Sequence, residues 1–210
     1  MYIYNAKIYP MDSDVIENGY VKVENGIIAE VSAGVPDPVS ESDINAEGMF
    51  LYPGFIDPHS HIGLIGEGLG FEGEDVNEDT DPITPQLRTI DGLCFTDGYF
   101  KDAYSCGVTT AVTGVGSSNP IGGDFIAVKT CGRCADEMLI REVGIKFALG
   151  ENPKSTFSDK DSTPVTRMAT AALIREALYK AKRYMQDKAE AEENGESAPD
   201  YDIKCEALIP

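Results

Sequence analysis

The chain has 210 residues, and its hydrophobic content of 42% is enough for a folded core, so we expect one or two globular domains. Its formal net charge of −19 at pH 7 repels phosphate backbones and anionic lipid, which argues against nucleic acid or a membrane surface as a partner.

No apolar run reaches the length of a membrane span, and the first five residues lack the basic and apolar blocks of a signal peptide. We therefore expect a soluble cytoplasmic protein. Its five cysteines fit reduced thiols better than a disulfide framework. Cys131-Gly132-Arg133-Cys134 is a lone C-x-x-C motif without a second ligand pair nearby, so we interpret it as a loop with two incidental thiols.

Residues 1–52 show short runs of β-branched residues separated by turn signals, which predicts a small β-sandwich segment. Asn25-Gly26, between two such runs, indicates a hairpin because both residues tolerate positive φ. Residues 35–43 are typical of a loop, and residues 44–51 return to strand around a turn at Glu47-Gly48.

The next stretch contains both histidines of the sequence. Pro53-Gly54 indicates a turn, Phe55-Ile56 a short buried strand, and Asp57-Pro58 the end of that strand. Residues two apart in an extended segment project from the same face, so His59 and His61 present two imidazoles to one point. An arbitrary His-x-His usually binds nothing, but one at the carboxyl end of a buried strand fits the site logic of a (β/α)8 barrel. We therefore predict a metal site there.

Residues 62–93 are rich in glycine and acids, and we leave open whether they form a lid over the site or a solvated insertion. A helix is predicted over residues 97–106 with Thr96 as its cap, followed by a strand over 108–115 that completes a βαβ step. Residues 114–123 lack the Lys-Ser/Thr of a phosphate loop, so we interpret them as a turn. Strands over 124–130 and 144–149 follow, with one or two helical turns at 135–141 between them.

The clearest helical pattern begins at Thr163-Pro164 and has apolar residues at helical spacing as far as Met185. We interpret its Met and Leu residues as core contacts. An acidic, linker-like stretch follows at 190–199, and another helical pattern at 201–209.

The motif Pro53-Gly54-Phe55-Ile56-Asp57-Pro58-His59-Ser60-His61 resembles the first-strand signature of the amidohydrolase superfamily, metal-dependent hydrolases that include dihydroorotases, dihydropyrimidinases and imidazolonepropionases. The segments 107–110, 119–123 and 146–153 are similar to the imidazolonepropionase-related branch. The resemblance implies an α/β fold. Residues 53–210 would form the first half of a (β/α)8 barrel, and residues 1–52 part of a composite β-sandwich.

The resemblance also implies a divalent metal, zinc in the first place and manganese or iron as alternatives, held by His59 and His61. Family members add a carboxylate, either a glutamate or a carboxylated lysine. Glu151 and Lys146 match these two options, and we favour Glu151 because we expect it at the carboxyl end of its strand. Asp57 is expected to cap backbone amides or orient an imidazole rather than bind the metal.

The family's other site residues, two histidines and an aspartate on later strands, have no counterpart here, so no catalytic residue is assigned within this chain. We expect the chain to be inactive alone and to require the missing carboxyl-terminal half, with a small cyclic amide or a peptide-like compound as the substrate. The alternatives are a non-catalytic metal-binding or assembly module and a fragment that forms a homo-oligomer through an exposed barrel edge.

Overall fold

The computed structural model describes residues 1–66 and 68–209. The chain divides into two compact units, Met1–Gly54 and Phe55–Pro210. Within the described residues, no helix is both long and apolar enough to cross a lipid bilayer.

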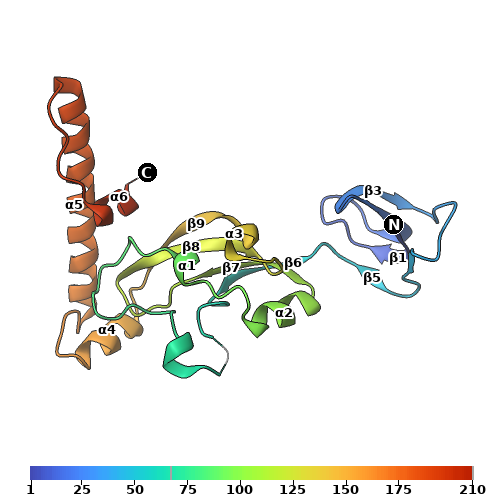
Figure 1. The fold of residues 1–210 in the computed structure, drawn as a ribbon, viewed down its shortest axis with the longest axis horizontal. Coiled ribbons are helices and arrows are strands. Elements are labelled where there is room, and N and C mark those ends of the chain that lie inside the picture. The colour runs from blue at the N-terminus through green and yellow to red at the C-terminus, as the bar shows by residue number, and fades with distance from the viewer. Residues whose placement is uncertain (67, 210) are drawn as a thin grey trace. The chain divides into compact units, whose positions relative to one another are not determined.

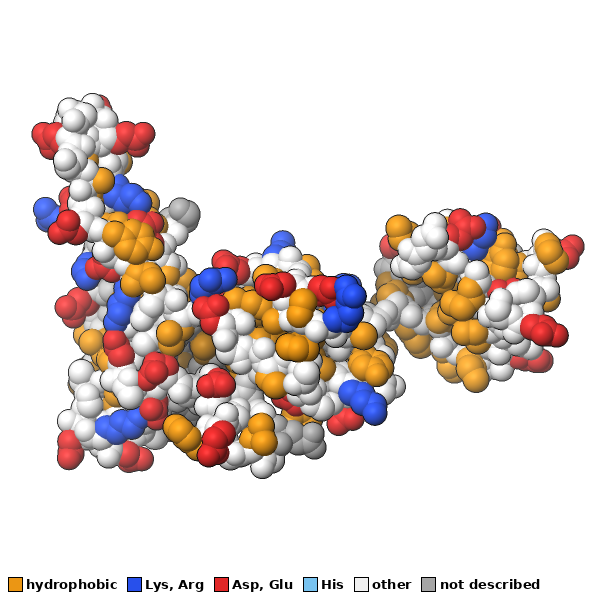
Figure 2. All heavy atoms as spheres, viewed as in Figure 1, with side chains coloured by type: hydrophobic (Ala, Val, Ile, Leu, Met, Phe, Trp, Pro, Cys, Tyr) orange, Lys and Arg blue, Asp and Glu red, His pale blue; other side chains and the backbone are white. Residues whose placement is uncertain are grey.

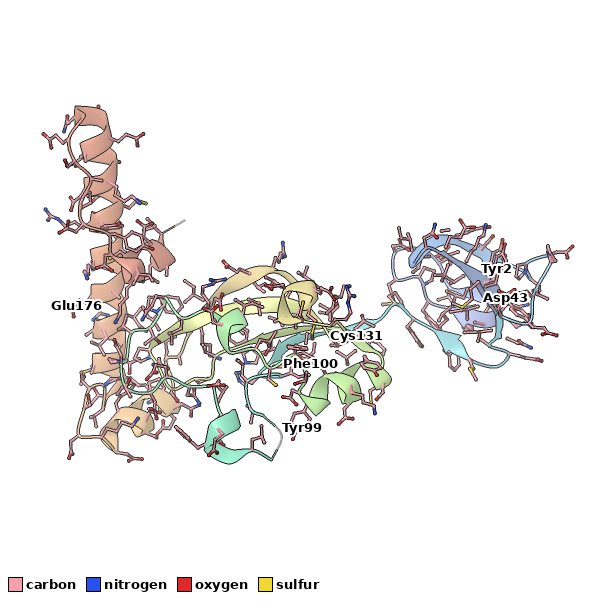
Figure 3. All side chains as sticks on the ribbon, in the orientation of Figure 1. Tyr2, Asp43, Tyr99, Phe100, Cys131 and Glu176 are labelled. Atoms are coloured by element: carbon pink, nitrogen blue, oxygen red, sulfur yellow. The ribbon has the colours of Figure 1, made fainter. Side chains whose placement is uncertain are left out.

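The first unit is a five-stranded sheet in the order β3-β2-β1-β4, with β5 also paired to β1. Its strands are β1 (Tyr2–Ile8), β2 (Ile16–Glu24), β3 (Ile27–Ala33), β4 (Ile44–Asn45) and β5 (Phe50–Leu51). The predicted hairpin is confirmed: β2 and β3 are antiparallel, and Asn25 and Gly26 both have positive φ. Asp43 accepts a hydrogen bond from the Tyr2 amide at 2.6 Å and so joins the loop before β4 to the start of β1 (Figure 3).

The second unit is built on a four-stranded sheet in the order β6-β7-β8-β9 (Figure 1). Its strands are β6 (Phe55–Ser60), β7 (Val108–Gly114), β8 (Ile121–Lys129) and β9 (Leu139–Phe147). The helix α2 (Gly98–Ser105) lies between β6 and β7 in the chain, and these two strands are parallel, as expected for a βαβ step. The mixed α/β class is thus confirmed.

The later strands differ from the prediction of a half barrel. Both β8 and β9 are antiparallel to the strand before them. The connection over residues 115–120 is too short for a helical crossover, which takes a dozen or more residues, so the chain can only turn back. The predicted strands 124–130 and 144–149 fall on β8 and β9. The predicted helical turns at 135–141 are wrong in part, because α3 (Ala135–Met138) leads directly into β9.

One core cluster joins this sheet to α2 and to the segments around it. Phe100 on α2 is buried on the side facing the sheet, while its neighbour Tyr99 is exposed (Figure 3). The N-cap of α2 is Asp97 rather than the predicted Thr96, since the Asp97 carboxylate accepts from the Tyr99 amide. The buried members of the cluster are Leu93, Phe100, Ala111, Ile126, Val128 and Met138.

The long acidic segment after β6 is fastened to the sheet. It contains a short 3-10 helix η1 (Gly70–Gly73) and α1 (Thr89–Gly92). Asn119 lies almost fully buried beneath it and donates from its side-chain nitrogen to the carbonyls of Glu78, at 2.5 Å, and Asp81, at 2.6 Å. From the other side, Lys160 pairs with Asp79 at 2.6 Å and Lys204 with Asp81 at 2.5 Å. These contacts argue against a simple solvated insertion.

The carboxyl-terminal helices are α4 (Glu151–Ser158), where no helix is predicted from the sequence, α5 (Arg167–Asn194) and α6 (Ile203–Leu208). The prediction that Pro164 begins the long helix is wrong, because the Thr166 side chain caps α5. The helix runs on to Asn194, into the stretch predicted to be a linker, and ends at Gly195 in the left-handed conformation. Figure 2 shows acidic side chains at the carboxyl-terminal end of α5.

The apolar stripe predicted on this helix is mostly not core. Met168 is 79% exposed, and Leu178 and Met185 are exposed as well. The buried side chains of α5 are Thr170, Ile174, Ala181, Tyr184 and Ala191, and of these Ala181 belongs to the predicted stripe. Ala181 and Tyr184 pack against Cys205 of α6, so the helix buries a different face from the one that its Met and Leu residues mark.

Candidate metal centre

The two histidines lie at the carboxyl end of β6. The Asp57 carboxylate accepts from the His59 backbone amide at 3.1 Å, which caps the chain as it leaves the strand. The Ser60 hydroxyl donates to the Val112 carbonyl at 3.1 Å and fixes the strand end to β7. The ring centroids of His59 and His61 are 5.4 Å apart, with an interplanar angle of 82°. The strand therefore brings both imidazoles to one place.

The orientation of His61 follows from a single hydrogen bond. Its Nδ1 lies 2.7 Å from the carbonyl oxygen of Gly114, at the end of β7. A carbonyl only accepts, so Nδ1 carries a proton, and in the neutral form of the ring Nε2 is the nitrogen with the lone pair. This is the arrangement that metal-binding histidines commonly show, where a backbone carbonyl fixes the tautomer and the ring.

The ring of His59 stacks on Phe125 of β8, with centroids 5.1 Å apart and an interplanar angle of 28°. His59 has a pKa below its ordinary value, first because nearby protein atoms displace water from the imidazole, and then because the Lys146 ammonium and His61 disfavour a further positive charge. Asp57 acts in the opposite sense. The balance favours the neutral imidazole, which is the form that binds a metal.

The two candidates for a third ligand lie in different surroundings. Lys146, on β9, places its ammonium 5.4 Å from the centroid of the Phe125 ring, beside the histidines. Glu151 was predicted at the carboxyl end of its strand, but in the structure it is the first residue of α4. Its carboxylate lies 3.4 Å from the Arg167 guanidinium and 3.6 Å from the Lys154 ammonium. A hollow of about 260 Å³ separates the end of β9 from this helix start and is lined by both residues.

Across residues 1–66 and 68–209, no three His, Cys, Asp or Glu side chains converge as a metal site would require. The donor set at the carboxyl end of β6 therefore consists of two imidazoles and, next to them, an amine. Two imidazoles on a rigid strand fit a first-row metal ion, while a protonated amine does not bind one.

The C-x-x-C motif lies away from this arrangement, in the loop that ends at α3. Cys131 is exposed and Cys134 half-buried, and both are free thiols (Figure 3).

Sequence reasoning missed Phe125 and Gly114. Phe125 was assigned to a strand but not to the site, because the pairing of β8 with β7 cannot be read from one sequence. Gly114 falls in the predicted strand 108–115 and in the predicted turn 114–123, with no role at the site assigned to it. The structure shows why glycine is needed at this position: a Cβ atom on residue 114 would lie 2.5 Å from the Phe125 ring, so a larger residue would displace the ring.

No protein-family model matches the chain. Amidohydrolase tasK of Hapsidospora irregularis is 36% identical over 184 residues, which cover 80% of this chain and 19% of that protein. The imidazolonepropionase of Thermoplasma acidophilum is 42% identical over 55 residues, covering 26% of this chain and 13% of the relative.

The crystal structure of an amidohydrolase from Thermotoga maritima MSB8 superimposes with a TM-score of 0.91 at 38% sequence identity. The match covers 99% of this chain and 54% of that one, so the chain spans about half the length of this structural neighbour. Fold, sequence and the first-strand motif agree: the chain belongs to the amidohydrolase superfamily.

Proposed function

We propose that this chain carries the first part of the metal centre of a hydrolase that acts on C–N bonds of a cyclic amide or a peptide-like small molecule. The observation that carries the proposal is the His61 ring, which donates from Nδ1 to the Gly114 carbonyl and lies beside His59, with the two ring centroids 5.4 Å apart. The names of the relatives support the class of reaction, since they include amidohydrolases. The similarity to the T. maritima protein and the β6-α2-β7 step support a place for these strands in a (β/α)8 barrel.

His59 and His61 would hold the metal, with zinc the first candidate and manganese or iron the alternatives. When bound, a divalent ion supplies a nucleophilic water at neutral pH and polarises the scissile carbonyl. The contribution of this chain is to hold the His61 ring through the Gly114 carbonyl and to favour the neutral imidazole of His59 through its lowered pKa.

For the third ligand, the geometry favours Lys146 over Glu151. The Glu151 carboxylate already lies near two cations, and the Lys146 ammonium lies on the same aromatic ring as the histidines. Lys146 becomes an oxygen ligand if its neutral amine adds to carbon dioxide, which forms an N–C bond and releases one proton to solvent. The carbamate replaces a positive charge with a negative one, as a divalent cation requires.

The test is equilibrium dialysis of the 210-residue chain against zinc and manganese, in buffer containing bicarbonate. We expect the wild type to bind, His59→Asn, His61→Asn and Lys146→Met to bind much more weakly, and the matched control Glu151→Gln to bind like the wild type. A wild type without affinity above background would refute the metal site. If Glu151→Gln lost the metal and Lys146→Met kept it, the assignment of the third ligand would be reversed.

Catalytic turnover needs a separate test from metal binding. The sequence has two histidines, and the proposal assigns both as metal ligands, so neither is left to transfer protons. We propose that hydrolysis needs further residues outside this chain. Hydrolysis of cyclic amides and dipeptides by the metal-loaded chain is measured with and without a fragment that supplies the remainder of the fold. Activity that appears only with the fragment supports the hydrolase, and metal binding without activity in either case supports a non-catalytic module.

A further inference from the structure

The side chains of the candidate metal centre meet on one aromatic ring. The Phe125 centroid lies 5.1 Å from the His59 centroid, 6.1 Å from the His61 centroid and 5.4 Å from the Lys146 ammonium. His59 lies nearly parallel to the ring, and His61 meets it at 67°. Two imidazoles and a cation from β6 and β9 thus share one neighbour on β8.

The three groups depend on this ring to different degrees. His61 has its hydrogen bond to Gly114, but in the part of the chain that the structure describes no hydrogen bond reaches the His59 ring nitrogens. Nor does any carboxylate there form an ion pair with Lys146. Stacking and the attraction between a cation and an aromatic face are the contacts that orient these two side chains.

The sheet is built to leave room for the ring. Phe125 is opposite Gly114 on β7 and opposite Gly144 on β9, so neither neighbouring strand places a side chain beside it. A Cβ at Gly114 would lie 2.5 Å from the ring, closer than such atoms approach. Phe125 is 8% exposed, yet it does not belong to the core cluster of Ile126 and Val128, which point to the other face of β8.

From these contacts we infer that Phe125 is the positioning residue of this centre: its ring fixes the orientation of His59 and Lys146 and supports that of His61. The expected effect on metal binding rests on the proposed function, whereas the placement of the side chains around Phe125 does not. Because the ring contacts side chains and not the reacting atoms, its role is to hold ligands in place before the metal arrives. Mutation of groups that orient metal ligands typically weakens metal binding 10–100-fold.

The experiment uses the full 210-residue chain in three variants. Phe125→Leu removes the aromatic face but keeps an apolar side chain, and Phe125→Tyr retains the aromatic face. Phe157→Leu is the matched control, because Phe157 is also buried, at 1% exposed, but lies on α4, outside the group that Phe125 forms with the histidines and Lys146. The first readout is NMR of the metal-free chain, following the ring protons of both histidines, their nitrogen tautomers and the Lys146 Hε protons. The second readout is the zinc dissociation constant.

In the metal-free wild type we expect His59 and Lys146 protons shifted upfield by the Phe125 ring. Phe125→Leu should abolish these shifts and weaken zinc binding by about tenfold. Phe125→Tyr should restore both, and Phe157→Leu should change neither. Unchanged proton shifts in Phe125→Leu would overturn the inference whether or not zinc binds. If Phe125→Leu lost the proton shifts but bound zinc as tightly as the wild type, Phe125 would not be a positioning residue for the metal ligands. A wild type that shows the shifts but binds no zinc would refute the proposed function and leave the placement of the side chains supported.

Discussion

Replacing Asn119 should release the acidic segment from the sheet. The Asn119 side chain is 2% exposed and donates two hydrogen bonds, to the carbonyls of Glu78 and Asp81. A hydrogen bond within a protein contributes about 1 kcal/mol net. The acceptors belong to the exposed Glu78 and the half-buried Asp81, so water can replace part of the loss, and Asn119→Ala should lower the free energy of unfolding by roughly 1–2 kcal/mol.

Asn119→Asp separates hydrogen bonding from side-chain size. The carboxylate has nearly the same shape but cannot donate, and it would lie against two carbonyl oxygens in a buried place. We expect it to be more destabilising than alanine at pH 8. The loss should shrink as the pH falls, because these surroundings raise the pKa of a carboxyl group and its protonated form can donate one bond.

Both variants are compared with the wild type by urea unfolding at pH 5 and pH 8, together with hydrogen exchange of the amides over residues 76–83. Faster exchange confined to this segment would agree with a local release. An aspartate variant as stable as the wild type at pH 8, with unchanged exchange, would refute the reasoning.

Asp202 has a pKa of about 2, chiefly because the Lys180 ammonium lies 2.6 Å from its carboxylate. This ion pair should stabilise the docking of α6 above about pH 4, and the stabilisation should be lost as the pH falls toward 2. Asp202→Asn keeps the N-cap and should cost about 0.5–1 kcal/mol at pH 7, because the Lys180 side chain is largely exposed and water screens the pair; the difference from the wild type should vanish near pH 2 in thermal unfolding. Thr113→Val removes a buried donor to the Ile62 carbonyl and should cost about 1–2 kcal/mol in urea unfolding, whereas the exposed Thr96→Val should have little effect. Gly114→Ala forces the Phe125 ring to move, so it should cost about 1–3 kcal/mol and also disturb the His59 resonances; unchanged resonances would contradict the close packing.

The local features that sequence determines directly were the ones predicted well. The Asn25-Gly26 hairpin depends on two residues that tolerate positive φ, and the His59 and His61 pair depends on the two-residue period of a strand. The helix α2 and the parallel step to β7 also follow from local patterns.

The predictions of strand direction and of the buried face of α5 were wrong because both features depend on contacts between segments far apart in the sequence. The direction of β8 and β9 is set by which strands pair, and the family resemblance suggested parallel strands where short connections impose antiparallel ones. On α5, Met168 and Leu178 marked an apolar stripe, but the neighbours of the helix decide which face is buried.

The same distinction applies to the site. The motif at the end of β6 supplied two candidate ligands, and the proposal of Lys146 over Glu151 rests on the position of α4 and on the partners of Glu151. Phe125 could be recognised only when β8 was placed between β7 and β9.

The central claim is that His59, His61 and Lys146 form one metal centre around Phe125. Anomalous diffraction at the zinc absorption edge, from crystals of the chain grown with zinc and bicarbonate, tests it most directly. We expect a strong peak about 2.0–2.1 Å from the Nε2 atom of His61 and from a ring nitrogen of His59, with Lys146 turned toward it as a carbamate. A peak bound by Cys131 and Cys134, or at Glu151 without Lys146, would contradict it.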